Sequence, residues 1–355
     1  MAYISFQPTD YCSTKLYTGN ASTNAITGVG FAPAMAWFKS RSNTNSHAIF
    51  NALMGAYSLS PSNTAAQYDS SGDGFTSLDS DGYTFNGSGG GGGTNASGFT
   101  YVGWNWKAGT TSGIATNGST TITPSSYSFD QTSGFSVIQY AGNSTSGAKI
   151  AHGLGATPAF IIIKPINLAG QAWVVYHQGL GETKYMEMNT TAAAATASWP
   201  FNDTAPDSVN FTVGNNNNVN TGYNYLALCF AEKSGYSKFT SYMGNGNADG
   251  PFIHTGFQPS WLMIKETDST SGWCMYDNKR PLSNPGYYNV NQNFLQANDT
   301  GVESDNSNLA LDFLSNGFKI RNSAGDTNGA GNSYIVMAFA EFPFVSSNSK
   351  SGTAR

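Results

Sequence analysis

The chain has 355 residues, which is enough for two or three domains or one large one. Only 10% of them are charged, against about 25% in an average globular chain, whereas 39% are hydrophobic, so the chain can bury a core. A formal charge of −5 with 16 Lys and Arg offers no basic surface for phosphate backbones, and no apolar run is long enough to span a membrane. We therefore expect a soluble, β-rich protein with no nucleic-acid partner, no membrane insertion and no secretory signal.

A four-residue motif, Tyr-x-Gly-Asn, occurs three times, at residues 17–20, 140–143 and 242–245. Each copy is followed by the same features in the same order. These are a Gly-rich turn, a Pro, an apolar run that ends in Lys, an aromatic-bearing segment and a Tyr-led apolar segment. Several spaced features in one order are typical of an internal repeat, so the sequence predicts three copies of one structural unit.

The apolar runs predict the central strands of each copy. They lie at residues 33–39, 158–164 and 259–265, and each is short, continuous and bounded by Pro and Lys. Such runs are typical of strands that are covered on both faces. Segments 83–85, 210–213 and 318–320 alternate as half-buried strands do, and helix signals are scarce. The predicted fold class is all-β, with three tandem antiparallel β-sandwich modules of jelly-roll-like form.

These patterns also divide the chain into domains. We predict modules at residues 1–109, 133–235 and 236–346, a Ser-, Thr- and Gly-rich linker at 110–132 and a flexible tail at 347–355. Because the linker separates the first two copies while the second runs directly into the third, we expect copy one to be the more independent. Lys39, Lys164 and Lys265 end the apolar runs, and we expect each to extend into solvent and blunt the strand edge.

Several kinds of chemical site can be weighed from the residues. The three cysteines are Cys12, Cys229 and Cys274. They lack a CxxC spacing, and Cys229 and Cys274 fall where other copies carry Ala, Val or Asn, so we interpret all three as small buried thiols. The acidic segment contains Asp69, Asp73, Asp79 and Asp81. A calcium loop would need ligands where this segment has Ser71 and Ser80, and Asp81 with Gly82 is already explained as a hairpin turn.

Candidate acid–base residues are equally sparse. Glu232 and Glu341 share a repeat position, but copy one has no carboxylate there, and a glycosidase needs two. His152 and His254 precede the Pro in copies two and three, whereas copy one has Thr27. We therefore predict no catalytic residue, no cofactor and no metal site.

The seven Trp residues separate into two groups. Six lie on predicted strands at repeat-equivalent positions and are interpreted as core. Trp199 lies outside that pattern, in a loop, and together with Tyr287 and Tyr288 forms the candidate recognition surface, because flat aromatic faces can stack on sugar rings. The unrepeated segments 68–81, 87–97, 196–207 and 280–288 are expected to carry recognition, since loops on a rigid scaffold can vary freely.

Some motifs extend beyond the internal repeat. The Tyr-x-Gly-Asn motif is followed by Gly-Phe-x-Pro and the Lys-ending run, and Asn-Thr-Thr-Ala-Ala stands at 189–193, Ser-Asn-Gly-Phe at 315–318 and Ala-Phe-Ala-Glu-x-Pro-Phe at 338–344. Together they resemble a family of repeat-bearing, tail-fibre-like virion proteins of tailed bacteriophages of marine bacteria, over residues 17–345. Copy one departs most, with Trp-Lys-Ala at 106–108 where the other copies have Phe-Ala-Glu.

The resemblance implies a virion component that assembles in the host cytoplasm and supplies no catalytic residues. Three functions remain open. The first is a non-enzymatic tail fibre or surface appendage that contacts the host, and the second is a capsid decoration or connector protein with a purely structural role. The third is a polysaccharide depolymerase. The expected partners are other virion proteins and host surface glycans. We expect the protein to be part of a larger assembly, for which a homotrimer is one candidate form.

Overall fold

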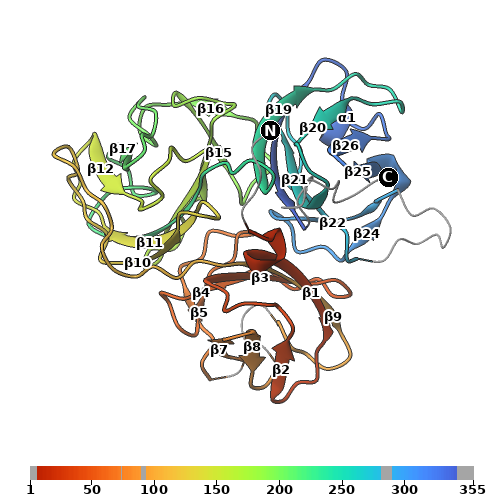
Figure 1. The fold of residues 1–355 in the computed structure, drawn as a ribbon, viewed down its shortest axis with the longest axis horizontal. Coiled ribbons are helices and arrows are strands. Elements are labelled where there is room, and N and C mark those ends of the chain that lie inside the picture. Colours follow the sequence, from red (N-terminus) through yellow and green to blue (C-terminus); the bar gives the residue numbers. More distant parts are fainter. Residues whose placement is uncertain (1–5, 73, 89–92, 281–289, 342–355) are drawn as a thin grey trace.

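Three lobes make up the molecule (Figure 1). The computed structural model describes residues 6–72, 74–88, 93–280 and 290–341. Strands account for 41% of the structure and helices for 3%, so the fold is all-β. We call residues 6–109 lobe 1, residues 110–235 lobe 2 and residues 236–341 lobe 3. No helix in the described ranges is long and apolar enough to cross a membrane.

The elements follow the chain from lobe to lobe. Lobe 1 contains η1 (Pro8–Asp10), β1 (Cys12–Thr18), β2 (Asn24–Thr27), β3 (Met35–Ser40), β4 (Ala48–Asn51), β5 (Tyr57–Ser58), β6 (Tyr68–Asp69), β7 (Phe75–Asp79), β8 (Gly82–Phe85) and β9 (Thr100–Trp106). Lobe 2 contains β10 (Ser126–Asp130), β11 (Phe135–Ala141), β12 (Ala148–Ala151), β13 (Phe160–Pro165), β14 (Val174–His177), β15 (Lys184–Glu187), β16 (Ala195–Thr196), β17 (Asn210–Val213) and β18 (Asn224–Phe230). Lobe 3 contains β19 (Ser237–Met243), β20 (Phe252–His254), β21 (Pro259–Glu266), β22 (Cys274–Asp277), β23 (Asn293–Gln296), β24 (Ser304–Asp305), η3 (Ser307–Leu309), β25 (Leu311–Leu314), β26 (Gly317–Ile320), α1 (Gly325–Asn328) and β27 (Ser333–Ala340).

Each lobe is built on one large antiparallel sheet and one smaller sheet. The large sheets have the orders β1-β9-β3-β4, β10-β11-β18-β13-β14-β15-β16 and β19-β27-β21-β22-β23-β24. The smaller sheets are β2-β8-β7, β12-β17 and β20-β26-β25, and a ribbon of β5 and β6 accompanies lobe 1. Among the described strands no sheet draws on two lobes and none closes into a barrel.

The central strands have apolar residues on both faces. In β21, Trp261 and Met263 point into a core that all three lobes share, whereas Leu262 and Ile264 pack into the separate core of lobe 3. The strands β3 and β13 alternate in the same way. Every residue of the three strands is buried, which confirms the prediction that these apolar runs form strands covered on both faces.

Three aromatic side chains meet at the centre of the shared core. Trp106 of lobe 1 lies 6.3 Å from Phe230 of lobe 2 and 5.7 Å from Phe339 of lobe 3, measured between ring centroids. Phe230 and Phe339 are 6.0 Å apart. We call these residues the central triad. The expectation that copy one is the more independent is therefore wrong, because Trp106 is buried against both other lobes.

The segment at residues 110–132, predicted to be a linker, contributes to lobe 2. Ser126–Asp130 form β10, which pairs along β11. Ile122 is buried in the core of lobe 2 and bridges to Ile150. The tail at 347–355 lies outside the described residues.

The Tyr and Gly of the repeated motif have a steric role. In lobe 2, Tyr140 stacks on Tyr225 at 5.1 Å and donates a hydrogen bond to the Val219 carbonyl at 2.6 Å. A Cβ on Gly142 would lie 2.0 Å from the Thr221 carbonyl oxygen, so only glycine fits beside the backbone of Thr221. Tyr17 with Gly19, and Tyr242 with Gly244, make the corresponding contacts in lobes 1 and 3.

The Asn of the motif is held by a second, buried Asn. The Asn220 side-chain oxygen accepts the Asn143 backbone N–H at 2.8 Å, and its amide donates to the carbonyls of Thr145 and Gly214. Asn95 and Asn328 hold Asn20 and Asn245 similarly in the other lobes. The motif thus fixes the loops that follow β1, β11 and β19, which gives it a structural reason to recur.

This packing predicts the effect of adding one methyl group. Gly142→Ala should lower the free energy of unfolding by about 2 kcal/mol or more, because the new Cβ meets a backbone carbonyl that cannot move freely. Gly222→Ala is the control, since a Cβ at that position would meet nothing within 4 Å. Urea unfolding of both variants measures the difference, and equal stabilities would contradict the steric role.

Candidate functional site

Trp199, the residue chosen for recognition, lies on lobe 2 just after β16. Its ring is partly buried, packs against the core of lobe 2 and meets Tyr185 of β15 edge to face, with 4.8 Å between centroids. Lys184 and Thr196 are exposed and paired across the β15–β16 ladder. An aromatic pair beside exposed polar side chains can stack on a sugar ring while neighbouring groups bond its hydroxyls.

The other two residues of the candidate surface, Tyr287 and Tyr288, lie outside the described residues. The aromatic neighbour that the structure gives Trp199 is Tyr185, a residue that the sequence analysis did not single out. No signal in the sequence marked Tyr185, because its contact with Trp199 arises from the β15–β16 ladder.

Asp79 and Asp81 of the acidic segment accept hydrogen bonds from other residues of lobe 1. Asp81 accepts the backbone N–H groups of Gly28 and Gly30 at 2.9 and 2.6 Å, and these bonds hold the pKa of its carboxyl below the usual value. Asp79 accepts the hydroxyls of Ser77 and Thr84. Asp73 lies outside the described residues. Within the described ranges no group of three His, Cys, Asp or Glu side chains could hold a metal ion.

The two repeat-related glutamates belong to separate ion pairs. Glu232 bonds Lys238 at 2.7 Å in the region between lobes 2 and 3. Glu341 pairs with Lys279 in lobe 3. Each carboxylate thus has its own lysine.

Three histidines are buried and bonded through both ring nitrogens. They are His47, His152 and His177. In each, Nδ1 accepts an N–H and Nε2 contacts a backbone carbonyl. Burial lowers the pKa of His47 to about 3 and the pKa values of His152 and His177 to about 4. These rings are neutral at pH 7 and have no free nitrogen for acid–base work.

The cysteines are equally inert. All three are buried and free of disulfides, Cys12 in the shared core and Cys229 and Cys274 in the cores of lobes 2 and 3. Burial raises the pKa of each thiol. The prediction of small buried thiols is confirmed, and a thiol held protonated in this way is a poor nucleophile.

The prediction that Lys39, Lys164 and Lys265 extend into solvent is wrong. All three are buried, and each ammonium group donates to backbone carbonyls. Lys164 donates to the carbonyls of Gln171 at 2.8 Å and of Thr64, in lobe 1, at 3.2 Å. Lys265 reaches a carbonyl of lobe 2 in the same way, and Lys39 bonds two carbonyls of its own lobe. The apolar strands end at a neighbouring lobe rather than at solvent, which is why their lysines are covered.

Two lobes meet at each of three seams, which we name by their lobes: 1–2, 2–3 and 3–1. One backbone bond recurs at all three: Gln67 N–H to Ile166 O at 2.9 Å, Ala194 N–H to Thr267 O at 2.9 Å and Glu303 N–H to Arg41 O at 2.8 Å. A ring N–H also crosses each seam, from Trp173 to Ser60 O, from Trp273 to Glu187 O and from His47 to Gln296 O. Each lobe thus offers different surfaces to its two neighbours, which is the geometry of a head-to-tail ring.

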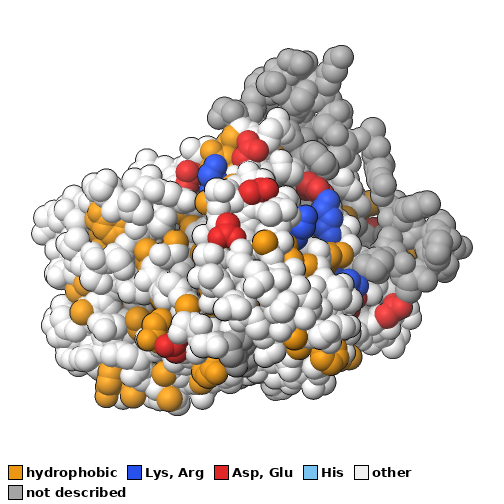
Figure 2. Space-filling model, turned by 90° about the horizontal axis from the view of Figure 1, so that it is seen from below, with side chains coloured by type: hydrophobic (Ala, Val, Ile, Leu, Met, Phe, Trp, Pro, Cys, Tyr) orange, Lys and Arg blue, Asp and Glu red, His pale blue; other side chains and the backbone are white. Residues whose placement is uncertain are grey.

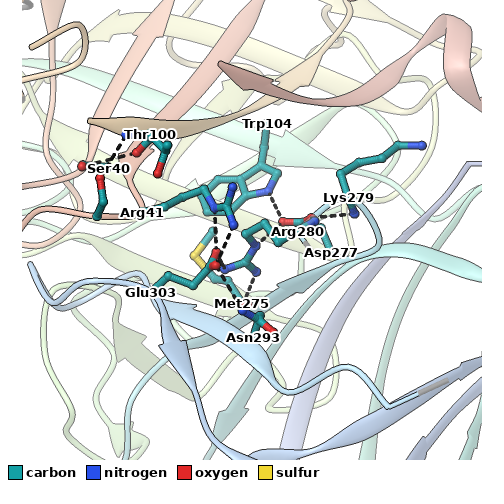
Figure 3. Close-up of polar contacts among 11 residues, drawn as sticks. Ser40, Arg41, Thr100, Trp104, Met275, Asp277, Lys279, Arg280, Asn293 and Glu303 are labelled. Atoms are coloured by element: carbon teal, nitrogen blue, oxygen red, sulfur yellow. Dashed lines mark hydrogen bonds and ion pairs between the residues drawn. The ribbon is translucent and has the colours of Figure 1, made fainter. Parts of the chain in front are cut away.

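Seam 3–1 also contains a buried charge cluster (Figure 3). Glu303 of lobe 3 bonds Arg41 of lobe 1 at 2.8 Å and Arg280 at 3.3 Å. Asp277 accepts from Arg280 Nε at 2.7 Å and from the indole N–H of Trp104, in lobe 1, at 2.9 Å. Arg280 also lies over the Trp104 ring, 5.7 Å from its centroid. Among the ion pairs of the described residues, Arg41 with Glu303 joins lobes 1 and 3, and Glu232 with Lys238 joins lobes 2 and 3 beside the point where the chain passes between them.

Sequence reasoning missed this cluster because its members are far apart along the chain. A signal was available in the repeat. Arg41 stands where the other seams have Ile166 and Thr267, and Glu303 where they have Gln67 and Ala194. In one copy these two positions carry opposite charges, whereas the other copies have uncharged residues there. This difference indicates an ion pair that is specific to one seam.

Comparison with known proteins gives a family but no activity. A family model described as a domain of unknown function (DUF7483) matches residues 7–343. The chain belongs to this family. No curated protein and no solved structure matches the chain.

The charge cluster predicts a large effect from removing one charge. Glu303→Gln should lower the free energy of unfolding by about 3 kcal/mol, because the buried Arg280 and the partly buried Arg41 lose their shared carboxylate. Glu232→Gln removes a more exposed pair and should cost about 1 kcal/mol or less. Chemical unfolding of both variants measures the contrast, and a small loss in Glu303→Gln would contradict the role of the cluster.

The buried lysines predict a pH dependence. Burial lowers the pKa of each to about 8, whereas the unfolded chain keeps these protons to about pH 10.5. Between these values the unfolded state binds more protons, so the stability that the lysines contribute should rise with pH, by about 1.4 kcal/mol per pH unit for each lysine. Urea unfolding between pH 7.5 and 9.5 measures the slope. Lys164→Met should reduce the slope of stability against pH by the contribution of one lysine, and an unchanged slope would contradict the prediction.

Proposed function

We propose that the protein is a non-enzymatic structural component of a bacteriophage virion, a tail-fibre-like appendage that contacts the host surface. One observation carries the non-enzymatic part. The buried His, Cys and Lys side chains, which are the groups most able to act as bases or nucleophiles, are all tied into the fold by burial or by backbone hydrogen bonds. The likeness of the repeat motifs to tail-fibre-like proteins supports the virion setting.

The surface is consistent with a recognition role. On the face seen in Figure 2, charged side chains are few, and uncharged atoms with scattered apolar side chains cover most of the described surface. An uncharged polar surface suits neutral sugar hydroxyls better than charged ligands. The Trp199–Tyr185 pair adds an aromatic face on lobe 2, supported by the core of that lobe.

The recognition part is tested by truncating the indole. Trp199→Ala should weaken binding to host cells or to purified surface polysaccharide by about tenfold or more, because a stacking face is lost. Trp199→Phe keeps a flat ring and should retain most of the binding. Thermal melting of both variants serves as the control for folding. Equal binding by Trp199→Ala and the unchanged protein would remove this residue from the recognition surface.

The virion setting has its own experiment. Labelled antibody against the protein should decorate the tails of intact particles. Labelling of the capsid would replace the appendage with a decoration protein, and absence from particles would overturn the virion assignment. Release of reducing ends from host polysaccharide by the purified protein would overturn the non-enzymatic assignment.

A further inference from the structure

Lobe 3 receives a histidine from each of the other lobes. His47 of lobe 1 contacts the Gln296 carbonyl through Nε2 at 2.9 Å. His177 of lobe 2 contacts the Val336 carbonyl through Nε2 at 3.1 Å. Both acceptors belong to lobe 3, on β23 and β27. The two seams of lobe 3 therefore each depend on an imidazole N–H.

A second bond fixes the protonation state of each ring. The Trp37 indole N–H donates to His47 Nδ1 at 2.8 Å, and the Gly179 backbone N–H donates to His177 Nδ1 at 2.9 Å. Because Nδ1 accepts in both rings, Nε2 must carry the proton and the ring must be neutral. A proton added at Nδ1 would face an N–H donor, so neither ring can become charged while its seam keeps this geometry.

The surroundings of the rings also oppose a positive charge. Burial is the main cause of the lowered pKa of His47, and the Lys39 ammonium and the Arg280 guanidinium lower it further, while backbone contacts at Gln296 and Asp299 raise it. His177 packs edge to face on Phe160. Burial is the main cause of its lowered pKa, and the Val336 carbonyl opposes this shift.

Seam 1–2 contains no such group among its described contacts. It is bonded by the Trp173 indole, the Lys164 ammonium and the Gln67 backbone, none of which changes charge between pH 7 and 4. The seams thus differ in their sensitivity to acid although they share one hydrogen-bond pattern.

We propose that acid releases lobe 3 from lobes 1 and 2 while seam 1–2 stays closed. An imidazole freed by opening binds a proton below about pH 6.5. In the closed seams, burial lowers the pKa of His47 to about 3 and that of His177 to about 4. The open state therefore binds more protons in this window, and each histidine favours opening about tenfold for every pH unit of acidification. With both seams open, the two histidines together give about a hundredfold per pH unit.

The repeated seam bond supplies three matched reporters. The amide protons of Glu303 and Ala194 close seams 3–1 and 2–3, and that of Gln67 closes seam 1–2. Hydrogen exchange of the full chain between pH 7 and 4, corrected for intrinsic rates, should lose protection first at Glu303 and Ala194 while Gln67 stays protected. Simultaneous loss at all three amides would overturn the proposal, as would retained protection at Glu303 and Ala194 until global unfolding.

Variants assign the effect to the two rings. His47→Gln with His177→Gln keeps an amide donor at each seam but removes the titration, so opening of lobe 3 should shift to lower pH. His152 is the matched control, because it has the same bonds but contacts only lobe 2, through Leu154 and Asp207. His152→Gln should leave the order of opening unchanged. An unshifted opening in the double variant, or a shift as large in His152→Gln, would overturn the role of His47 and His177.

Discussion

The central triad is the constraint on which the rest of the structure depends. Trp106, Phe230 and Phe339 come from three lobes, and each needs the other two to cover its ring. One face of each large sheet therefore packs into the core that the three lobes share. The other face packs against the smaller sheet of the same lobe and forms a separate core. An isolated lobe would expose its share of the common core, so contact with its two neighbours stabilises each lobe.

Burial of that inner face also explains the polar groups at the seams. A strand that ends against a neighbouring lobe brings its last side chains and carbonyls out of water, and each must find a partner there. Lys164 and Lys265 find carbonyls of the adjacent lobe. At seam 3–1 the chain does not pass directly from one lobe to the next. There Arg41 and Glu303 provide opposite charges where the other seams have uncharged side chains.

Much of the fold could be predicted because strands in a layered protein follow short-range patterns. The apolar runs around Trp261 and its counterparts show that both faces are covered, and Cys229 and Cys274 fall at positions that accept small residues. The lysines could not be placed, because a charge at a strand end looks the same in sequence whether solvent or another lobe follows. The contact of Tyr185 with Trp199 depends on which distant segments meet, and no local pattern encodes that. The contact of Arg41 with Glu303 is marked only by a difference between copies of the repeat.

The head-to-tail seams carry a consequence for how the molecule can vary. Three separate chains arranged in this way would share one sequence, so any substitution would appear at every seam and assembly would weaken on dilution. A single chain supplies its three lobes at a high effective concentration, and closure is then independent of how much protein is present. Each seam can also acquire its own residues, as the ion pair of Arg41 with Glu303 illustrates. Because the three lobes belong to one chain, the three seams of the ring can differ in sequence.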